Sequence, residues 1–368
     1  MKHAAKAAIL AMLLGSCTTL PDTPTRAVDP PTPCAATAQF SFVCGADKPE
    51  DLAHIPDTPW LIASGFAKGA GLKLVDTRQR TARIWFTGRA DQIARDPAFP
   101  DCDQPPDPAL FTTRGLSLRG VAPGKARLHV VNHGGRESIE VFSVDFGDAR
   151  QKPALQWQGC LLMPPGHAAN SVTTYSDGTV LATVLTRPGT SITDFVEGRV
   201  TGGVYQRRPG ETAFQLLPGT QLPGNNGLEA ARDDSGFYVI AFGLRQVLGY
   251  DRHDSSVPLW RLTVPDFMPD NIHWDGDRLI IAGMMREEPA CGGVRRIIDG
   301  VADGMTCHRG YAVAQVDPVA HQLTMLAYGP PDPQFNGASA AILIGQQLWL
   351  GSYQADRIAV RALPYALP

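Results

Sequence analysis

The chain has 368 residues and a net charge of −3, and 43% of its residues are hydrophobic and 19% charged. This hydrophobic content supports a full core, whereas the charge balance provides neither a basic surface for nucleic acid nor a polybasic patch for a membrane. The 37 glycines and 31 prolines favour many short strands with tight turns over long helices.

The N-terminus has the pattern of a bacterial export signal. Basic residues precede an apolar segment, residues 7–14, that is too short to span a bilayer. Leu14-Gly15-Ser16-Cys17 follows and resembles a lipobox. We therefore expect a lipoprotein signal peptide over residues 1–17 and a lipid on Cys17, with an ordinary cleaved signal as the alternative. Thr18, in place of Asp, favours the outer membrane facing the periplasm, with the lipid as the only membrane contact.

The segment after the signal, residues 18–38, is rich in Pro, Thr and Asp and is typical of an extended tether. No second change of composition follows, so residues 39–368 are predicted to form one domain.

Apart from Cys17, six of the seven cysteines remain, and an even number in an exported chain indicates up to three disulfides. The sequence leaves the pairing open; we favour Cys291–Cys307, which brackets a Gly-rich segment, and Cys34–Cys44. No CxxC pair supports a zinc or thioredoxin-like site.

Short β-branched or aromatic runs between Gly, Pro and Asp predict the strands of the domain. They recur at about 45–60 residues, so a domain of about 330 residues divides into about six units. We predict an all-β fold, a six-bladed β-propeller, with an array of β-sandwiches as the alternative. The predicted strands, in chain order, are residues 60–64, 72–75, 126–131, 139–144, 179–184, 236–240, 278–282, 312–316 and 347–350.

Acidic and amide side chains occupy four positions that we expect just before strands. In a propeller, residues that enter the innermost strand of each blade converge at one end of the channel. Calcium binds six to eight oxygens of carboxylates, amides and water, and Asn and Asp at strand starts are otherwise mostly turn formers. The candidate ligands are Glu50, Asn170, Asn226, Asp270 and Asn271.

Several short motifs resemble the paraoxonase/arylesterase family. They include residues 50–57 with 61–65, and Thr113-Arg-Gly-Leu-Ser117 with residues 128–133. Asn226-Gly-Leu228, followed by residues 233–238, resembles a phrase of the SMP-30/gluconolactonase propellers, and Asp270-Asn-Ile resembles the "DNI" phrase. The motifs keep the family order over residues 45–285. The resemblance implies a six-bladed propeller with a catalytic Ca²⁺ that hydrolyses lactones or aryl esters.

The resemblance also assigns roles to single residues. It places the calcium ligands on the same five side chains, Glu50, Asn170, Asn226, Asp270 and Asn271. Asp51 matches one ligand of a second, structural calcium, but Ser171 stands where that site needs Asp. His133 matches one histidine of the paraoxonase pair, whereas Arg114 replaces the other, and Met284 replaces a further channel histidine.

Two functions follow as hypotheses. In the first, Ca²⁺ polarises the carbonyl of a small lactone or ester, Asp270 accepts a proton from water, His133 assists or orients, and Arg114 binds an anionic group or supplies a fixed charge. In the second, the propeller binds a ligand or partner protein in the periplasm without catalysis. We expect structural or surface roles for His129, His167 and His273.

Overall fold

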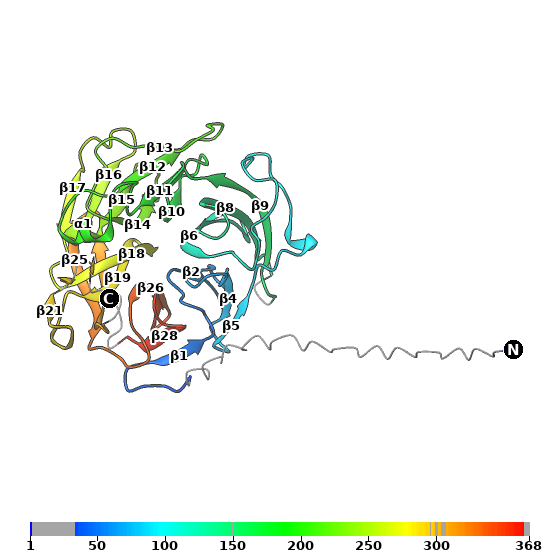
Figure 1. Cartoon of the computed structure of the whole chain (residues 1–368). Helices are drawn as coiled ribbons and strands as arrows, with labels where there is room; N and C mark the ends of the chain where they lie inside the picture. The colour runs from blue at the N-terminus through cyan, green and yellow to red at the C-terminus, as the bar shows by residue number, and fades with distance from the viewer. Residues whose placement is uncertain (2–33, 149–150, 295, 299–300, 303–306, 364–368) are drawn as a thin grey trace. The chain divides into compact units, whose positions relative to one another are not determined.

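Six four-stranded antiparallel sheets follow one another around a common axis in the unit formed by residues 34–368 (Figure 1). The computed structural model describes residues 1, 34–148, 151–294, 296–298, 301–302 and 307–363. This is the predicted six-bladed β-propeller. The expected signal peptide with Cys17, and the tether up to residue 33, lie outside the described residues.

Blades 1 to 3 each use four consecutive strands, with the first strand innermost. Blade 1 contains β2 (Leu52–His54), β3 (Trp60–Ala63), β4 (Lys73–Asp76) and β5 (Thr81–Ile84). Blade 2 contains β6 (Thr113–Ala122), β7 (Lys125–Asn132), β8 (Ser138–Asp145) and β9 (Ala154–Leu162), preceded by the 3₁₀ turn η1 (Ala90–Gln92). Blade 3 contains β10 (Ala169–Thr174), β11 (Val180–Val184), β12 (Gly203–Arg207) and β13 (Gln215–Leu216), with α1 (Ile192–Val196) between its second and third strands.

Blade 5 carries an insertion, and blade 6 closes the ring. Blade 4 contains β14 (Asn225–Ala230), β15 (Gly236–Ala241), β16 (Gln246–Asp251) and β17 (Trp260–Thr263), with η2 (Phe242–Leu244). Blade 5 contains β18 (Phe267–Asp275), β19 (Arg278–Met285), β24 (Tyr311–Asp317) and β25 (Gln322–Gly329), interrupted by β20 (Glu287–Glu288), η3 (Pro289–Cys291), β21 (Gly293–Val294), β22 (Ile297–Ile298) and β23 (Val301–Ala302). Blade 6 joins β26 (Ala338–Ile344), β27 (Gln347–Ser352) and β28 (Arg357–Ala362) to the N-terminal strand β1 (Ser41–Cys44).

Apolar side chains between neighbouring blades form the core. Strands such as Val180–Val184 are buried along their whole length because each blade of the ring packs between two neighbouring blades, which cover both of its faces. The pairing of β1 with β28 joins the two ends of the domain, and the predicted Cys34–Cys44 disulfide links β1 to the segment before it. The predicted Cys291–Cys307 disulfide spans the blade 5 insertion, and Cys102–Cys160 is the third pair.

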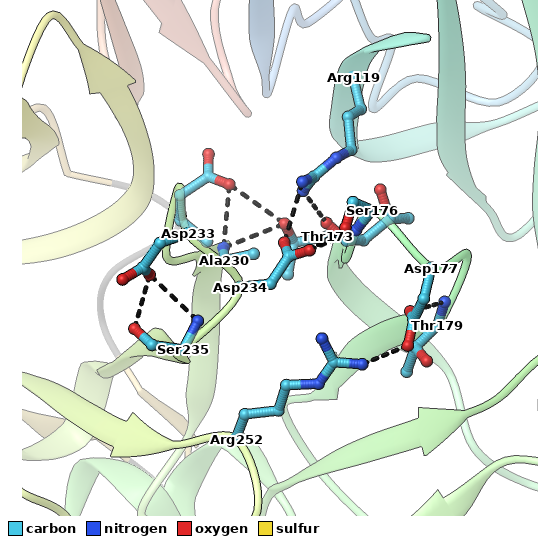
Figure 2. Close-up of polar contacts among 12 residues, drawn as sticks. Arg119, Thr173, Ser176, Asp177, Thr179, Ala230, Asp233, Asp234, Ser235 and Arg252 are labelled. Atoms are coloured by element: carbon cyan, nitrogen blue, oxygen red, sulfur yellow. Dashed lines mark hydrogen bonds and ion pairs between the residues drawn. The ribbon is translucent and has the colours of Figure 1, made fainter.

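An arginine of blade 2 connects three blades (Figure 2). Arg119, on the long strand β6, donates to the backbone oxygen of Thr174 in blade 3 at 2.7 Å and to the Asp234 carboxylate in blade 4 at 2.9 Å. The same carboxylate accepts a hydrogen bond from the Ser176 backbone N–H at 2.9 Å. Figure 2 shows Arg119 and Ser176 reaching Asp234, with the Arg252–Asp177 ion pair beside them. The cluster joins the channel rim across blades 2, 3 and 4.

Among the described helices, none combines the length and the apolar character that a bilayer crossing requires.

Candidate functional site

The innermost strands share an irregularity at the same level of the propeller axis. Register shifts occur after Thr113, Ala169, Asn225, Pro269 and Ala338, in five successive blades. A β-bulge adds a residue to one strand and redirects side chains, often beside active sites. The candidate side chains therefore lie within bulged strands in blades 3, 4 and 5, rather than before them as the sequence suggested; only Glu50 precedes its strand.

The bulged segments pack backbone against backbone around the axis. A Cβ atom on Gly115 would lie 2.6 Å from the Cα of Ser171, and one on Gly227 would lie 2.5 Å from the backbone oxygen of Asp270. Only glycine allows this approach. The close packing brings residues of blades 2 and 3, and of blades 4 and 5, to the same level.

Four of the five candidate ligands are joined in pairs by hydrogen bonds. Asn271 donates its Nδ2 hydrogens to Oε1 and to the backbone oxygen of Glu50, at 3.0 and 3.2 Å. Asn170 Nδ2 lies 2.5 Å from Asn226 Oδ1. Glu50, Asn226, Asp270 and Asn271 are all buried, and Asn170 is half-buried. Residues more than 200 positions apart therefore meet at the axis.

The electrostatics of this cluster are those of crowded carboxylates. Burial raises the pKa of Glu50 well above its ordinary value, and the nearby charges of Asp51 and Asp270 raise it further. The hydrogen bond from Asn271 and the charge of Arg114 act in the opposite direction. Among the described residues, neither Glu50 Oε2 nor Asn271 Oδ1 has a hydrogen-bond partner, although both atoms are buried. Buried oxygens without donors, beside acidic groups, favour a cation between them.

Blade 2 carries two candidate catalytic residues, Arg114 and His133, and the charge of Glu50 acts on Arg114. Arg114 lies within the bulge of β6, and its guanidinium stacks on the ring of Phe66, 3.4 Å from the centroid. Burial lowers the pKa of Arg114 to about 10, opposed by the carboxylates of Glu50 and Glu137. His133 Nδ1 lies 2.6 Å from Glu137 Oε2. Sequence reasoning missed Glu137, although it lies only four residues after His133.

Met284, which stands where the resemblance implies a further channel histidine, has apolar surroundings. Met284 is buried, and its sulfur accepts a hydrogen bond from the Tyr353 hydroxyl at 3.2 Å. It belongs to an apolar cluster with Phe195, Phe242 and Met268. Phe195, Phe242 and Tyr353 lie in connections between the second and third strands of their blades, whereas Met268 and Met284 lie near the ends of β18 and β19. The cluster is at the same end of the blades as the candidate ligands.

A second group of polar side chains, Asp51, Glu229 and His273, follows the candidate ligands along the innermost strands. Asp51 is fully buried and accepts hydrogen bonds from the Leu116 N–H at 2.7 Å and from His273 Nε2 at 2.6 Å. Burial alone would lower the pKa of His273, but the carboxylates of Asp51 and Glu229 raise it to about 10. The two carboxylates therefore favour the protonated form of the His273 ring.

Beyond this level, a cavity of about 800 Å³ continues between the innermost strands. Its lining includes Arg119, Glu229, Arg232, His273 and Trp274. These residues follow the candidate ligands along the strands. The cavity and the apolar cluster around Met284 therefore lie on opposite sides of the candidate ligands.

Comparison with solved structures places this geometry among known propellers. A gluconolactonase from Xanthomonas campestris superposes with a TM-score of 0.52 at 16% identity, covering 88% of this chain and 89% of the other. The chain shares the fold of that enzyme. A luciferin-regenerating enzyme superposes with a TM-score of 0.50 at 14% identity, covering 88% and 94% of the two chains. No model of a protein family matches the sequence, and no curated protein matches it either.

The donor set fits calcium better than a transition metal. It consists of two carboxylates, Glu50 and Asp270, and amides that offer carbonyl oxygens. Hard oxygen ligands suit Ca²⁺, whereas zinc and copper prefer imidazole or thiolate. A group formed by Cys102, Glu140 and Cys160 is no metal site, because the two cysteines form a disulfide.

Proposed function

We propose that the protein is a calcium-dependent hydrolase of small lactones or aryl esters, exported and attached through a lipid on Cys17 to the outer membrane, facing the periplasm. The observation that carries the proposal is the pair of buried oxygens, Glu50 Oε2 and Asn271 Oδ1, that lack hydrogen-bond donors among the described residues at the propeller axis. The fold shared with a gluconolactonase supports the reaction class.

Glu50, Asn170, Asn226, Asp270 and Asn271 would hold the ion. When bound, Ca²⁺ would supply Lewis-acid polarisation of the substrate carbonyl and stabilise negative charge on its oxygen. The chain itself must move the proton of the attacking water. Asp270 and His133 are the two candidate groups for that transfer. Arg114 holds a fixed positive charge near Glu50, pinned over the ring of Phe66.

A second function is a propeller that binds a small ligand or a partner protein without turnover. The specific observation in its favour is the replacement of two expected histidines. Arg114 is held by the Phe66 ring and by two backbone oxygens, and Met284 is buried against Tyr353. Neither side chain accepts protons from water at neutral pH.

Hydrolysis of phenyl acetate and of small aliphatic lactones, before and after treatment with EDTA, tests the proposal. We expect turnover that EDTA abolishes and that added Ca²⁺, but not Mg²⁺, restores, since Mg²⁺ demands a tighter octahedral site. Turnover that is insensitive to the chelator would contradict the metal-centred mechanism. Calcium binding without turnover of any compound would favour the non-catalytic function.

A further inference from the structure

A continuous series of polar contacts links five blades around the channel. The Thr173 hydroxyl of blade 3 donates a hydrogen bond to Glu229 Oε1 of blade 4 at 3.1 Å. The other carboxylate oxygen of Glu229 lies 3.5 Å from Nδ1 of His273 in blade 5. Nε2 of His273 lies 2.6 Å from Oδ1 of Asp51 at the start of blade 1, and Oδ2 of Asp51 accepts a hydrogen bond from the Leu116 N–H of blade 2 at 2.7 Å. The His273 ring therefore stands in the middle of the series.

Hydrogen-bond donors surround the carboxylate of Asp51. This side chain is fully buried, and its Oδ1 accepts hydrogen bonds from the Leu52 N–H at 2.8 Å and from His273 Nε2 at 2.6 Å. Its Oδ2 accepts the hydrogen bond from the Leu116 N–H. A carboxylate only accepts hydrogen bonds, so Nε2 of the ring carries a hydrogen. Three N–H groups thus already stabilise the charge that a metal ion would otherwise neutralise.

The position of Ser171 departs from a metal site in the same place. The resemblance implies a second, structural calcium beside Asp51, and that site needs a carboxylate where Ser171 stands. Ser171 is buried, and its backbone N–H donates to the Thr183 hydroxyl at 3.0 Å. Calcium requires six to eight oxygen ligands and prefers charged ones. One expected carboxylate is therefore a neutral hydroxyl, and the other is bound to N–H groups, so these residues do not fit a second calcium.

We propose that the His273 ring occupies the place of this second ion and joins blades 1, 4 and 5 in its stead. Through its two nitrogens, the ring reaches the carboxylates of Asp51 and Glu229, which come from different blades. An ion at this point would connect the same two carboxylates by its charge, whereas the ring is a rigid group whose backbone belongs to β18. The chain therefore binds one calcium ion, at Glu50 and the other four candidate ligands. This count rests on the proposed function, but the joining of the blades does not.

Isothermal titration calorimetry of the full-length chain, after EDTA treatment and dialysis, counts the calcium ions that bind. We expect one ion in the wild type. In His273→Asp the new carboxylate faces those of Asp51 and Glu229, and we expect a second ion. Ile84→Asp is the matched control, because it adds the same charge at an exposed position on the outer strand of blade 1, and it should bind one ion. Two ions in the wild type, or a single ion in His273→Asp, would overturn the replacement of the ion by the ring.

Thermal unfolding in EDTA tests the joining role without any ion. His273→Ala removes the ring between a fully buried carboxylate, Asp51, and a mostly buried one, Glu229. The Tm should fall by about 6–10 °C, the range for a broken buried ion pair in a domain of this size. His273→Gln, whose amide N–H can still donate to Asp51, should recover part of the loss. His253→Ala, at an exposed position, is the control and should leave Tm unchanged.

The outcomes separate this inference from the proposed function. Wild-type protein that binds no calcium overturns the proposed function, and the Tm values in EDTA still decide whether the ring joins the blades. Wild-type protein that binds one ion, together with an unchanged Tm in His273→Ala, overturns this inference alone. A second ion in the wild type also overturns this inference and leaves the proposed function standing.

Discussion

The Glu50→Gln variant should be at least as stable as the wild type without calcium and less stable than the wild type with calcium. Burial and the neighbouring Asp51 and Asp270 raise the pKa of Glu50, so in the absence of a cation its charge is unfavourable. Gln is neutral and its Oε1 can keep the hydrogen bond from Asn271. Without calcium, Glu50→Gln should therefore be at least as stable as the wild type.

The calcium response should be much smaller in the variant. At a free concentration of about 100 times Kd, binding stabilises the wild type by about 2.7 kcal/mol. At about 2 °C per kcal/mol for a domain of this size, Tm rises by about 5 °C. We expect loss of one of two carboxylates to weaken binding about 100-fold. The same calcium concentration then contributes only about 0.4 kcal/mol, or about 1 °C.

Thermal unfolding followed by circular dichroism, with EDTA or with Ca²⁺, measures both effects. Glu140→Gln is the control, because Glu140 is an equally buried carboxylate whose oxygens bind Arg136, Ser138 and Trp157. It should cost about 2–3 kcal/mol in both conditions, with the full calcium shift preserved. Equal calcium shifts in wild type and Glu50→Gln, or no shift in the wild type at any concentration, would refute the assignment of the axial site.

Two further predictions concern stability away from the site. Burial, and secondarily Arg127, lower the pKa of His129 to about 3. As the pH falls, His129 takes up a proton in the unfolded chain before it does so in the folded protein. The contribution of His129 to the free energy of unfolding should therefore be fully present above about pH 6.5 and fall by up to about 1.4 kcal/mol per pH unit towards pH 3. Urea titrations at several pH values measure the slope of the free energy of unfolding against pH. This slope should be shallower in His129→Leu than in the wild type and unchanged in His253→Asn, an exposed position. Identical slopes in the wild type and His129→Leu would contradict the prediction. Arg119→Ala should lower the free energy of unfolding by about 1–2 kcal/mol because Asp234 loses its ion-pair partner, and Arg119→Lys should recover part of that loss. An unchanged urea midpoint in Arg119→Ala would show that the contacts of Arg119 with Thr174 and Asp234 do not stabilise the fold.

Much of the fold follows from local patterns. The run at residues 236–240 becomes the strand Gly236–Ala241, and the run at residues 139–144 becomes Ser138–Asp145. Turn dipeptides and β-branched residues specify such strands because their effects reach only a few positions along the chain. The spacing of the strands then predicts six blades, and both disulfides favoured from the sequence are formed, with sequence separations of 10 and 16 residues.

The details of the candidate site were less accessible. Types and spacings of residues drew attention to Glu50, Asn226 and Asp270, but their role as calcium ligands stays a prediction. The pairing of Glu137 with His133 depends on the conformation of the connection between β7 and β8, which only the tertiary structure shows. The partnership of Asp51 with His273 joins blades 1 and 5, 222 residues apart.

The sequence by itself determined that this chain forms short strands in six repeating units, since strand and turn propensities are local. Only the tertiary structure decided which side chains meet at the axis. Bulges at one level of five innermost strands redirect them, and a bulge depends on how a strand pairs with its neighbour and how closely the blades approach one another. Those are properties of the closed ring, and no single segment of the chain contains them.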